Sequence, residues 1–166
     1  ASGGIGSQTA QELCVKDYAV SGCYRNGGDV CDAMADDINK FGVFEPYCLN
    51  LRSENEAVRL AEYAVQTYGR IDLLVNCAGI GEIAPLTECN RWEEIINVNL
   101  NGTIRMCRAV LPYMLRMGSG NIVNISSVWG ECGSACEAAY SASKGGVNAF
   151  TKALAKEVGI MGGRGN

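Results

Sequence analysis

The sequence predicts an α/β fold with a doubly wound parallel sheet and helices on both faces. Short apolar runs of strand length alternate along the chain with longer segments of helical periodicity, which is the order that βαβ units produce. Small and polar residues directly follow two of the apolar runs, and open parallel sheets bind ligands at that end of their strands. The same pattern therefore predicts both the fold class and the place of a ligand site.

Four strands are expected in chain order. The runs at 18–24 (YAVSGCY) and 44–49 are short and largely apolar. The run at 71–76 is apolar up to Val75 except for Asp72, as in a strand buried on both faces, and residues 121–126 mix polar and apolar residues.

Helices are expected where apolar residues recur every three or four positions, at 7–16, 29–41, 54–68, 91–117 and 137–158. Within the helix at 54–68, the residues at that spacing are Val58, Ala61, Val65 and Tyr68. We expect these four side chains to face the core.

Composition narrows the class of protein. The 166 residues, 48% of them hydrophobic, amount to one domain, residues 1–166. A net charge of −4 without a long basic run argues against nucleic acid as the main partner. No apolar stretch approaches the roughly 18 residues of a membrane span and no signal peptide opens the chain. We therefore expect a cytoplasmic protein that does not bind a membrane.

Histidine is absent, which excludes a Ser–His–Asp triad and a histidine-ligated metal centre. The nine cysteines lack the C-x-x-C pairs of zinc and redox sites. Cys132 and Cys136 form a close pair, and we interpret them as reduced thiols rather than a disulfide. No metal site is predicted.

Tyr140 and Lys144, in the run AAYSASKGG, are the strongest candidates for chemistry. On a helix, residues four apart share one face, with Cβ atoms about 5–6 Å apart. A cation beside a phenol favours the phenolate, which suits a general acid that works near neutral pH. The spacing alone also occurs on many solvated helix faces, so other motifs must support this interpretation.

Three further motifs support it. Glycines at 3, 4 and 6 precede the first helix, where exposed N–H groups and the helix dipole favour a phosphate. Asn76, Ala78 and Gly79 end the apolar strand with small residues that let a ligand approach closely. The strand at 121–126 leads directly to Ser126 and Ser127 at its carboxyl end.

These motifs, in this order, resemble those of the short-chain dehydrogenase/reductase family. Gly4 and Gly6 match the second and third glycines of the family's T-G-x-x-x-G-x-G loop, and the segment at 76–79 is similar to its N-N-A-G, with Cys77 in place of the second Asn. The resemblance covers essentially the whole chain and implies a Rossmann-like fold. It implies four catalytic residues at the family's spacing: Asn99, Ser127, Tyr140 and Lys144.

The resemblance also implies the role of each catalytic residue in reducing a ketone to a secondary alcohol. Tyr140 would protonate the developing alkoxide, and Lys144 would assist Tyr140 and hold the ribose hydroxyls of the cofactor. Ser127 would hydrogen-bond the carbonyl oxygen. Asn99 would anchor a water that relays protons to Lys144.

For the cofactor, the resemblance implies a nicotinamide dinucleotide. Arg25 directly follows the strand at 18–24, at the position where the family distinguishes its cofactors, and a guanidinium pairs well with the 2′-phosphate of NADP(H). We therefore expect NADP(H) rather than NAD(H), although Gly3 stands where many NADP-dependent members carry a basic residue. The expected cofactor contacts are Ser2, Gly4, Ile5, Gly6, Arg25, Asn50, Leu51, Asn76, Ala78, Gly79, Tyr140 and Lys144.

Within the family, the chain is most similar to bacterial 3-oxoacyl-acyl-carrier-protein reductases. The segment at 126–146 also resembles the elongation-factor-P 5-aminopentanone reductases. A sugar or steroid dehydrogenase and an inactive dinucleotide-binding fragment remain alternatives. The resemblance implies a homotetramer, paired through the helices at 91–117 and 137–158, with acyl carrier protein as a candidate partner.

The ends of the chain differ from the family pattern. A family member has an apolar strand before the glycine loop and further strands after the position of residue 166. That first strand lies between the strands at 18–24 and 71–76. Without it, we expect unpaired backbone edges and a gap in the core, and we expect the chain to be a fragment.

Overall fold

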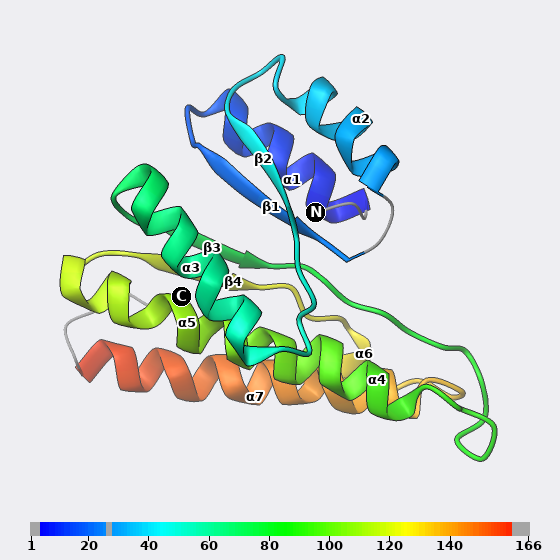
Figure 1. The fold of residues 1–166 in the computed structure, drawn as a ribbon. Helices are drawn as coiled ribbons and strands as arrows, with labels where there is room; N and C mark the ends of the chain where they lie inside the picture. Colours follow the sequence, from blue (N-terminus) through cyan, green and yellow to red (C-terminus); the bar gives the residue numbers. More distant parts are fainter. Residues whose placement is uncertain (1–3, 26–27, 161–166) are drawn as a thin grey trace.

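The computed structural model describes residues 4–25 and 28–160, without the side chains of 28–32 and 160. Helices and strands alternate as the sequence predicts (Figure 1). The elements are α1 (Gly4–Val15), β1 (Val20–Tyr24), α2 (Gly28–Ile38), β2 (Phe44–Cys48), α3 (Glu54–Tyr68), β3 (Leu73–Asn76), α4 (Trp92–Ile96), the π-helical turn η1 (Asn97–Asn101), α5 (Gly102–Met117), β4 (Asn121–Asn124), α6 (Trp129–Cys132) and α7 (Ala138–Ile160).

The described strands form two parallel pairs. β1 pairs with β2, with Val20 opposite Phe44, and β3 pairs with β4, with Leu73 opposite Asn121. Figure 1 shows α1 and α2 on one side of the strands and α3, α5 and α7 on the other. All four predicted strands are confirmed, as is their parallel direction.

A slot separates β1 from β3. Two adjoining cavities, of about 190 and 740 Å³, are lined from one side by β1 residues such as Ser21 and from the other by β3 residues such as Leu73 and Leu74. Within the described residues, neither strand forms backbone ladder bonds across this slot. The gap lies where the sequence analysis expects it.

Apolar side chains gather in separate clusters on the two sides of the slot. Phe44 packs with Ala10, Cys14 and residues of α2, whereas a larger cluster joins α3, α5 and β4 around Met106. The predicted core face of α3 is partly wrong, because Val58 is 40% exposed. The buried residues of α3 are Ala57, Leu60 and Ala61. The two alanines have small side chains, which let α3 approach α5 closely.

The single helix predicted at 91–117 consists of three consecutive pieces. The Gly102 N–H bonds to the carbonyl of Asn97, five residues back, which defines the π turn η1. Glycine at this position also leaves room for Leu51, whose Cβ would lie 3.2 Å from a Cβ added at 102. Thr103 closes the turn by donating its hydroxyl to the Asn99 carbonyl at 2.8 Å.

The short helix α6 was not predicted, because four residues carry too little periodicity to be recognised. It packs closely on α7. In the part of the chain described here, no helix combines the length and apolarity needed to cross a bilayer.

Candidate active site

A pocket of about 490 Å³ opens at the carboxyl ends of β1, β2 and β3. Most of the predicted cofactor contacts line it, namely Gly4, Ile5, Gly6, Arg25, Asn50, Leu51, Ala78 and Gly79. The chain segments that sequence analysis assigned to a cofactor from separate motifs therefore meet around one cavity.

The amino end of α1 borders this pocket. The helix begins at Gly4 rather than at the predicted residue 7, so two glycines of the predicted phosphate turn form its first turn. The first N–H groups of a helix have no intrahelical acceptor and favour an anion. An added Cβ at Gly4 would meet no heavy atom within 4 Å, so the backbone is open to a ligand. Ser2 lies outside the described residues.

The loop between β2 and α3 forms another wall of the pocket. The Asn50 N–H donates to the Glu56 carboxylate at 2.5 Å, and its side-chain oxygen accepts the Arg52 N–H at 3.1 Å. Leu51 is fixed through its carbonyl, which accepts a bond from Arg105 at 3.1 Å. Both predicted contacts thus lie at the pocket on a well-supported loop.

Asn76 behaves differently from the other predicted contacts. Its side-chain amide donates to Asn124 Oδ1 at 2.9 Å and to Cys107 Sγ at 3.5 Å. Asn124 in turn donates to Thr151 on α7 at 2.9 Å. Asn76 lines the slot rather than the 490 Å³ pocket and ties β3 to β4, so its predicted cofactor contact stays a prediction.

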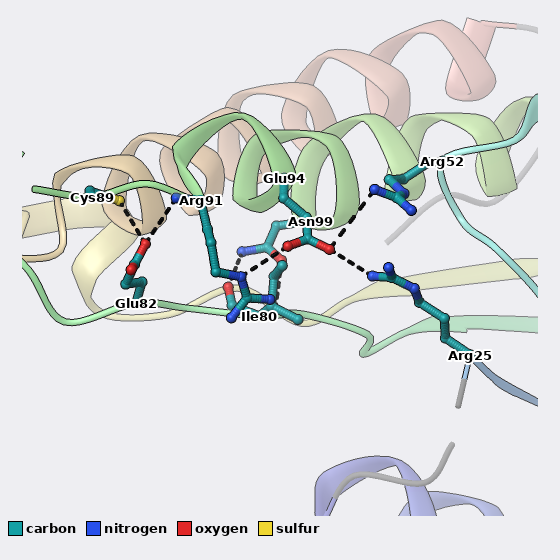
Figure 2. Close-up of polar contacts among 8 residues, drawn as sticks. All are labelled: Arg25, Arg52, Ile80, Glu82, Cys89, Arg91, Glu94 and Asn99. Carbon is teal, nitrogen blue, oxygen red and sulfur yellow. Dashed lines mark hydrogen bonds and ion pairs between the residues drawn. The ribbon is translucent and has the colours of Figure 1, made fainter. Parts of the chain in front are cut away.

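Asn99 fixes the segment that follows β3. Its side chain is fully buried in η1, accepts the Ile80 N–H at 2.8 Å and donates to the Ile80 carbonyl at 2.9 Å. Figure 2 shows the two bonds side by side. The π turn brings this side chain toward the loop, and the amide supplies both a donor and an acceptor where a backbone segment needs each.

Lys144 lies on α7 beside the same loop. Its side chain donates to the Ile125 carbonyl at 2.8 Å, and the residue is 5% exposed. Burial lowers the pKa of Lys144 below its ordinary value, because the charged form loses solvation. A Cβ added at Gly79 would lie 3.4 Å from Asn99 Oδ1 and 3.5 Å from Lys144 Nζ, so Gly79 borders both predicted catalytic residues.

Tyr140 lies one turn before Lys144, and the ammonium is 5.8 Å from the centre of its ring. The ring also borders Gly81, where an added Cβ would lie 3.5 Å from Tyr140 Cδ2. Asn99, Tyr140 and Lys144 therefore meet along the 79–81 segment, which continues from the pocket wall.

Ser127 follows β4 and accepts the Trp129 N–H at 3.2 Å. The adjacent Ser126 donates to the Lys144 carbonyl at 3.1 Å. Gly130 holds α6 against α7, because a Cβ there would lie 2.7 Å from the Lys144 carbonyl carbon. These contacts place Ser127 on a loop fixed next to Lys144, and no hydrogen bond joins Ser127 to Tyr140 among the described residues.

Sequence reasoning missed Ser143. This fully buried residue donates to the Tyr140 carbonyl at 2.7 Å and accepts from Asn99 Nδ2 at 3.0 Å, so it links η1 to α7. The available signal was its place in a stripe with Ala139 and Val147, both buried, at four-residue spacing. A serine in an otherwise apolar stripe indicates a buried polar partner.

Sequence reasoning also missed a cluster of charges at the pocket edge. The Glu94 carboxylate on α4 accepts from Arg25 at 2.7 Å and from Arg91 at 2.9 Å, and it lies 4.0 Å from Arg52. Figure 2 shows Glu94 among the three arginines. Hydrogen bonds from Arg25 and Arg91 lower the pKa of Glu94 to about 2. These residues are far apart in the sequence and share no motif, so no sequence pattern indicated that they form a cluster.

The comparison with known families agrees with this geometry. The model of the short chain dehydrogenase family matches residues 1–162. The chain belongs to that family. Among curated relatives, the 3-oxoacyl-[acyl-carrier-protein] reductase of Thermotoga maritima is 38% identical over 95% of this chain. The chain spans 65% of the length of that relative.

Two solved structures are similar to this chain in fold. A metagenomic short-chain oxidoreductase in complex with NADP superimposes with a TM-score of 0.91 at 31% identity, covering 99% of this chain and 75% of that one. An NAD+-bound xylitol dehydrogenase gives a TM-score of 0.93 at 27% identity, covering 99% and 64%. The predicted Rossmann-like α/β class is confirmed, and these neighbours do not distinguish the two cofactors.

Proposed function

We propose that the natural protein containing residues 1–166 is an NADP(H)-dependent reductase that converts a ketone, a 3-oxoacyl thioester by preference, to a secondary alcohol. One observation carries this proposal. Asn99, Tyr140 and Lys144 meet at the 79–81 segment, which borders the same pocket as the amino end of α1. A proton donor and a phosphate-binding helix end are the two parts that such a reductase requires.

The pocket fits a nicotinamide dinucleotide. The amino end of α1 offers N–H groups to a pyrophosphate, and Ala78 and Gly79 are exposed on the opposite wall. Gly79 has no side chain between the pocket and the Lys144 ammonium, so ribose hydroxyls have access to that ammonium. When bound, the cofactor supplies the hydride.

The side chains of the chain itself handle the proton and the developing charge. Tyr140 donates a proton to the carbonyl oxygen as negative charge builds on it. Lys144, held by the Ile125 carbonyl, stabilises the resulting phenolate. Ser127 donates its hydroxyl to the same substrate oxygen. Asn99 keeps the 79–81 segment in place and anchors a water beside Lys144.

The relatives support a thioester substrate. The Thermotoga maritima relative is named for reduction of a 3-oxoacyl group carried by acyl carrier protein. Acyl carrier protein is accordingly the proposed partner. A sugar-alcohol dehydrogenase is the second candidate, favoured by the fold match to xylitol dehydrogenase. Turnover with an acetoacetyl thioester but not with xylitol would distinguish the two.

The experiment that tests the proposal replaces Tyr140 by Phe. Loss of a general acid costs about 10²–10⁴-fold in rate, so NADPH oxidation with an acetoacetyl thioester should fall by that factor, with cofactor affinity little changed. Tyr113→Phe is the matched control, because Tyr113 lies on α5 beside Arg116 and is not among the residues that line the 490 Å³ pocket. Turnover of Tyr140→Phe within a few-fold of the parent would contradict the assignment.

Residues 1–166 expressed alone test the alternative of an inactive dinucleotide-binding fragment. The slot leaves β1 and β3 unpaired with each other, so α1 lacks a continuous sheet behind it. We expect these residues alone to show no carbonyl reduction. Turnover by that species in a spectrophotometric NADPH assay would show that the slot does not disturb the pocket.

A further inference from the structure

The charges at the pocket edge raise a question that the proposed function leaves open. Arg25 lines the pocket, yet its guanidinium already bonds to Glu94 at 2.7 Å. Among the described residues, Glu94 is the one acid that contacts Arg25. A phosphate that approaches Arg25 therefore meets an occupied guanidinium and a second negative charge.

The carboxylate is held firmly in this position. Its Oε2 accepts from Arg91 Nε at 2.9 Å, on the side away from Arg25, and its Oε1 also faces Arg52 at 4.0 Å. The three arginines come from separate segments, so motion of one loop does not release Glu94. Its side chain is 22% exposed, whereas each arginine is 43–49% exposed, so Glu94 is the least solvated member of the cluster.

The two cofactors would affect the ion pair between Arg25 and Glu94 differently. NADP(H) carries a 2′-phosphate, which must take Arg25 from Glu94 and lie near its carboxylate. NAD(H) carries an uncharged ribose hydroxyl at that place and leaves the ion pair intact. The negative charge of Glu94 therefore works against the phosphorylated cofactor and has little effect on the other.

Resting on the proposed function, we propose that Glu94 is a specificity-determining residue, which competes with the 2′-phosphate for Arg25 and so narrows the preference for NADP(H) over NAD(H). The carboxylate acts as an internal substitute for the phosphate. Because Arg52 and Arg91 also lie beside Glu94, the cluster has three arginines and one acid, which leaves two positive charges unbalanced. That excess allows a phosphate to bind and limits the penalty that Glu94 imposes.

The test is Glu94→Gln in the natural full chain, with the affinities for NADPH and NADH measured by fluorescence titration. The amide keeps the shape and removes the charge. Because an exposed ion pair is a weak interaction, NADPH should bind about three- to fivefold tighter and NADH should change less than about twofold. The gain should shrink at high salt, where such charges are screened.

Glu93→Gln is the matched control, since Glu93 is the exposed neighbour on α4 and removes the same charge. It should leave the ratio of the two affinities unchanged. An equal change in this ratio in Glu93→Gln and Glu94→Gln would mean that general surface charge causes the effect, and it would overturn the inference. An unchanged ratio of the NADPH and NADH affinities in Glu94→Gln would also overturn it.

Arg25→Ala completes a double-mutant cycle with Glu94→Gln. In that background Glu94→Gln should give a smaller gain in NADPH affinity, because no guanidinium is left to release. A full gain would contradict competition for Arg25. Binding of neither cofactor by the unaltered protein would instead refute the proposed function on which the inference rests.

Discussion

Replacing Asn99 by Ala removes three hydrogen bonds from the centre of the site. The side chain accepts the Ile80 N–H at 2.8 Å, donates to the Ile80 carbonyl at 2.9 Å and donates to Ser143 at 3.0 Å. Each such bond contributes about 0.5–1.5 kcal/mol net, and a buried group left without a partner costs about 1–3 kcal/mol. Since Ser143 keeps its bond to Tyr140, we expect a total loss of about 2–4 kcal/mol.

Two measurements check this expectation in the natural full chain. Urea unfolding gives the change in stability, a large fraction of the 5–15 kcal/mol that domains typically possess. Amide exchange at Ile80 gives the local effect, because its N–H bonds to the substituted side chain. A loss of about 1.4 kcal/mol in the local opening free energy raises the amide exchange rate tenfold. Exchange at the Ile80 N–H should therefore accelerate at least about tenfold.

Asn101→Ala is the control, because it removes an asparagine from the same π turn and only one side-chain bond, at 2.8 Å to Asn97. It should cost about 0.5–1.5 kcal/mol and leave Ile80 protected. Equal losses for the two variants, with unchanged exchange at Ile80, would refute the claim that Asn99 holds the loop beside the pocket.

Further predictions concern the cofactor, packing, pH and assembly. Arg25→Asp should weaken NADPH binding far more than NADH binding, and equal losses in titration would show that Arg25 does not contact the phosphate. Gly130→Ala should lower the thermal midpoint by roughly 2–10 °C, since its Cβ would meet α7 backbone, whereas Gly159→Ala, with open space around it, should not. Because the pKa of Glu94 falls from 4.5 to about 2 on folding, its contribution to the free energy of unfolding is complete above pH 4.5 and is lost as the pH falls toward 2. Between these pH values, the urea midpoint of Glu94→Gln should therefore depend less on pH than that of the parent. Light scattering of the natural full chain should give a tetramer, and a monomer at micromolar concentration would contradict this.

The sequence predicted the elements well because periodicity and strand-end motifs are local signals. Tyr140 and Lys144 lie four residues apart, so their shared helix face follows from spacing alone. The orientation of α3 was less accessible. Val58 is apolar and yet exposed, whereas the buried face consists of small residues and Leu60. Which apolar stripe is buried depends on the neighbouring helix, here α5, and not on hydrophobicity alone.

The polar contacts between distant segments were beyond sequence reasoning. Glu94 and Arg25 are 69 residues apart and belong to different elements. The side-chain bond between Asn99 and Ser143 spans 44 residues. Such pairs depend on how the helices are rotated, and no local pattern encodes that rotation. The prediction of Arg25 as a cofactor contact consequently omitted the acid that forms an ion pair with it.

The π turn has a consequence for how this chain tolerates insertions and deletions. An α-helix rotates by about 100° per residue, and η1 accommodates one residue more than a regular turn. Removing Leu100 would allow α4 and α5 to join as one regular helix, at the cost of losing the bulge that brings Asn99 to Ile80. Because η1 absorbs the extra residue, the same deletion would leave α5 in register, with Met106 and Val110 still filling the core against α3. A single extra residue thus sets the position of the site without setting the register of the helix core.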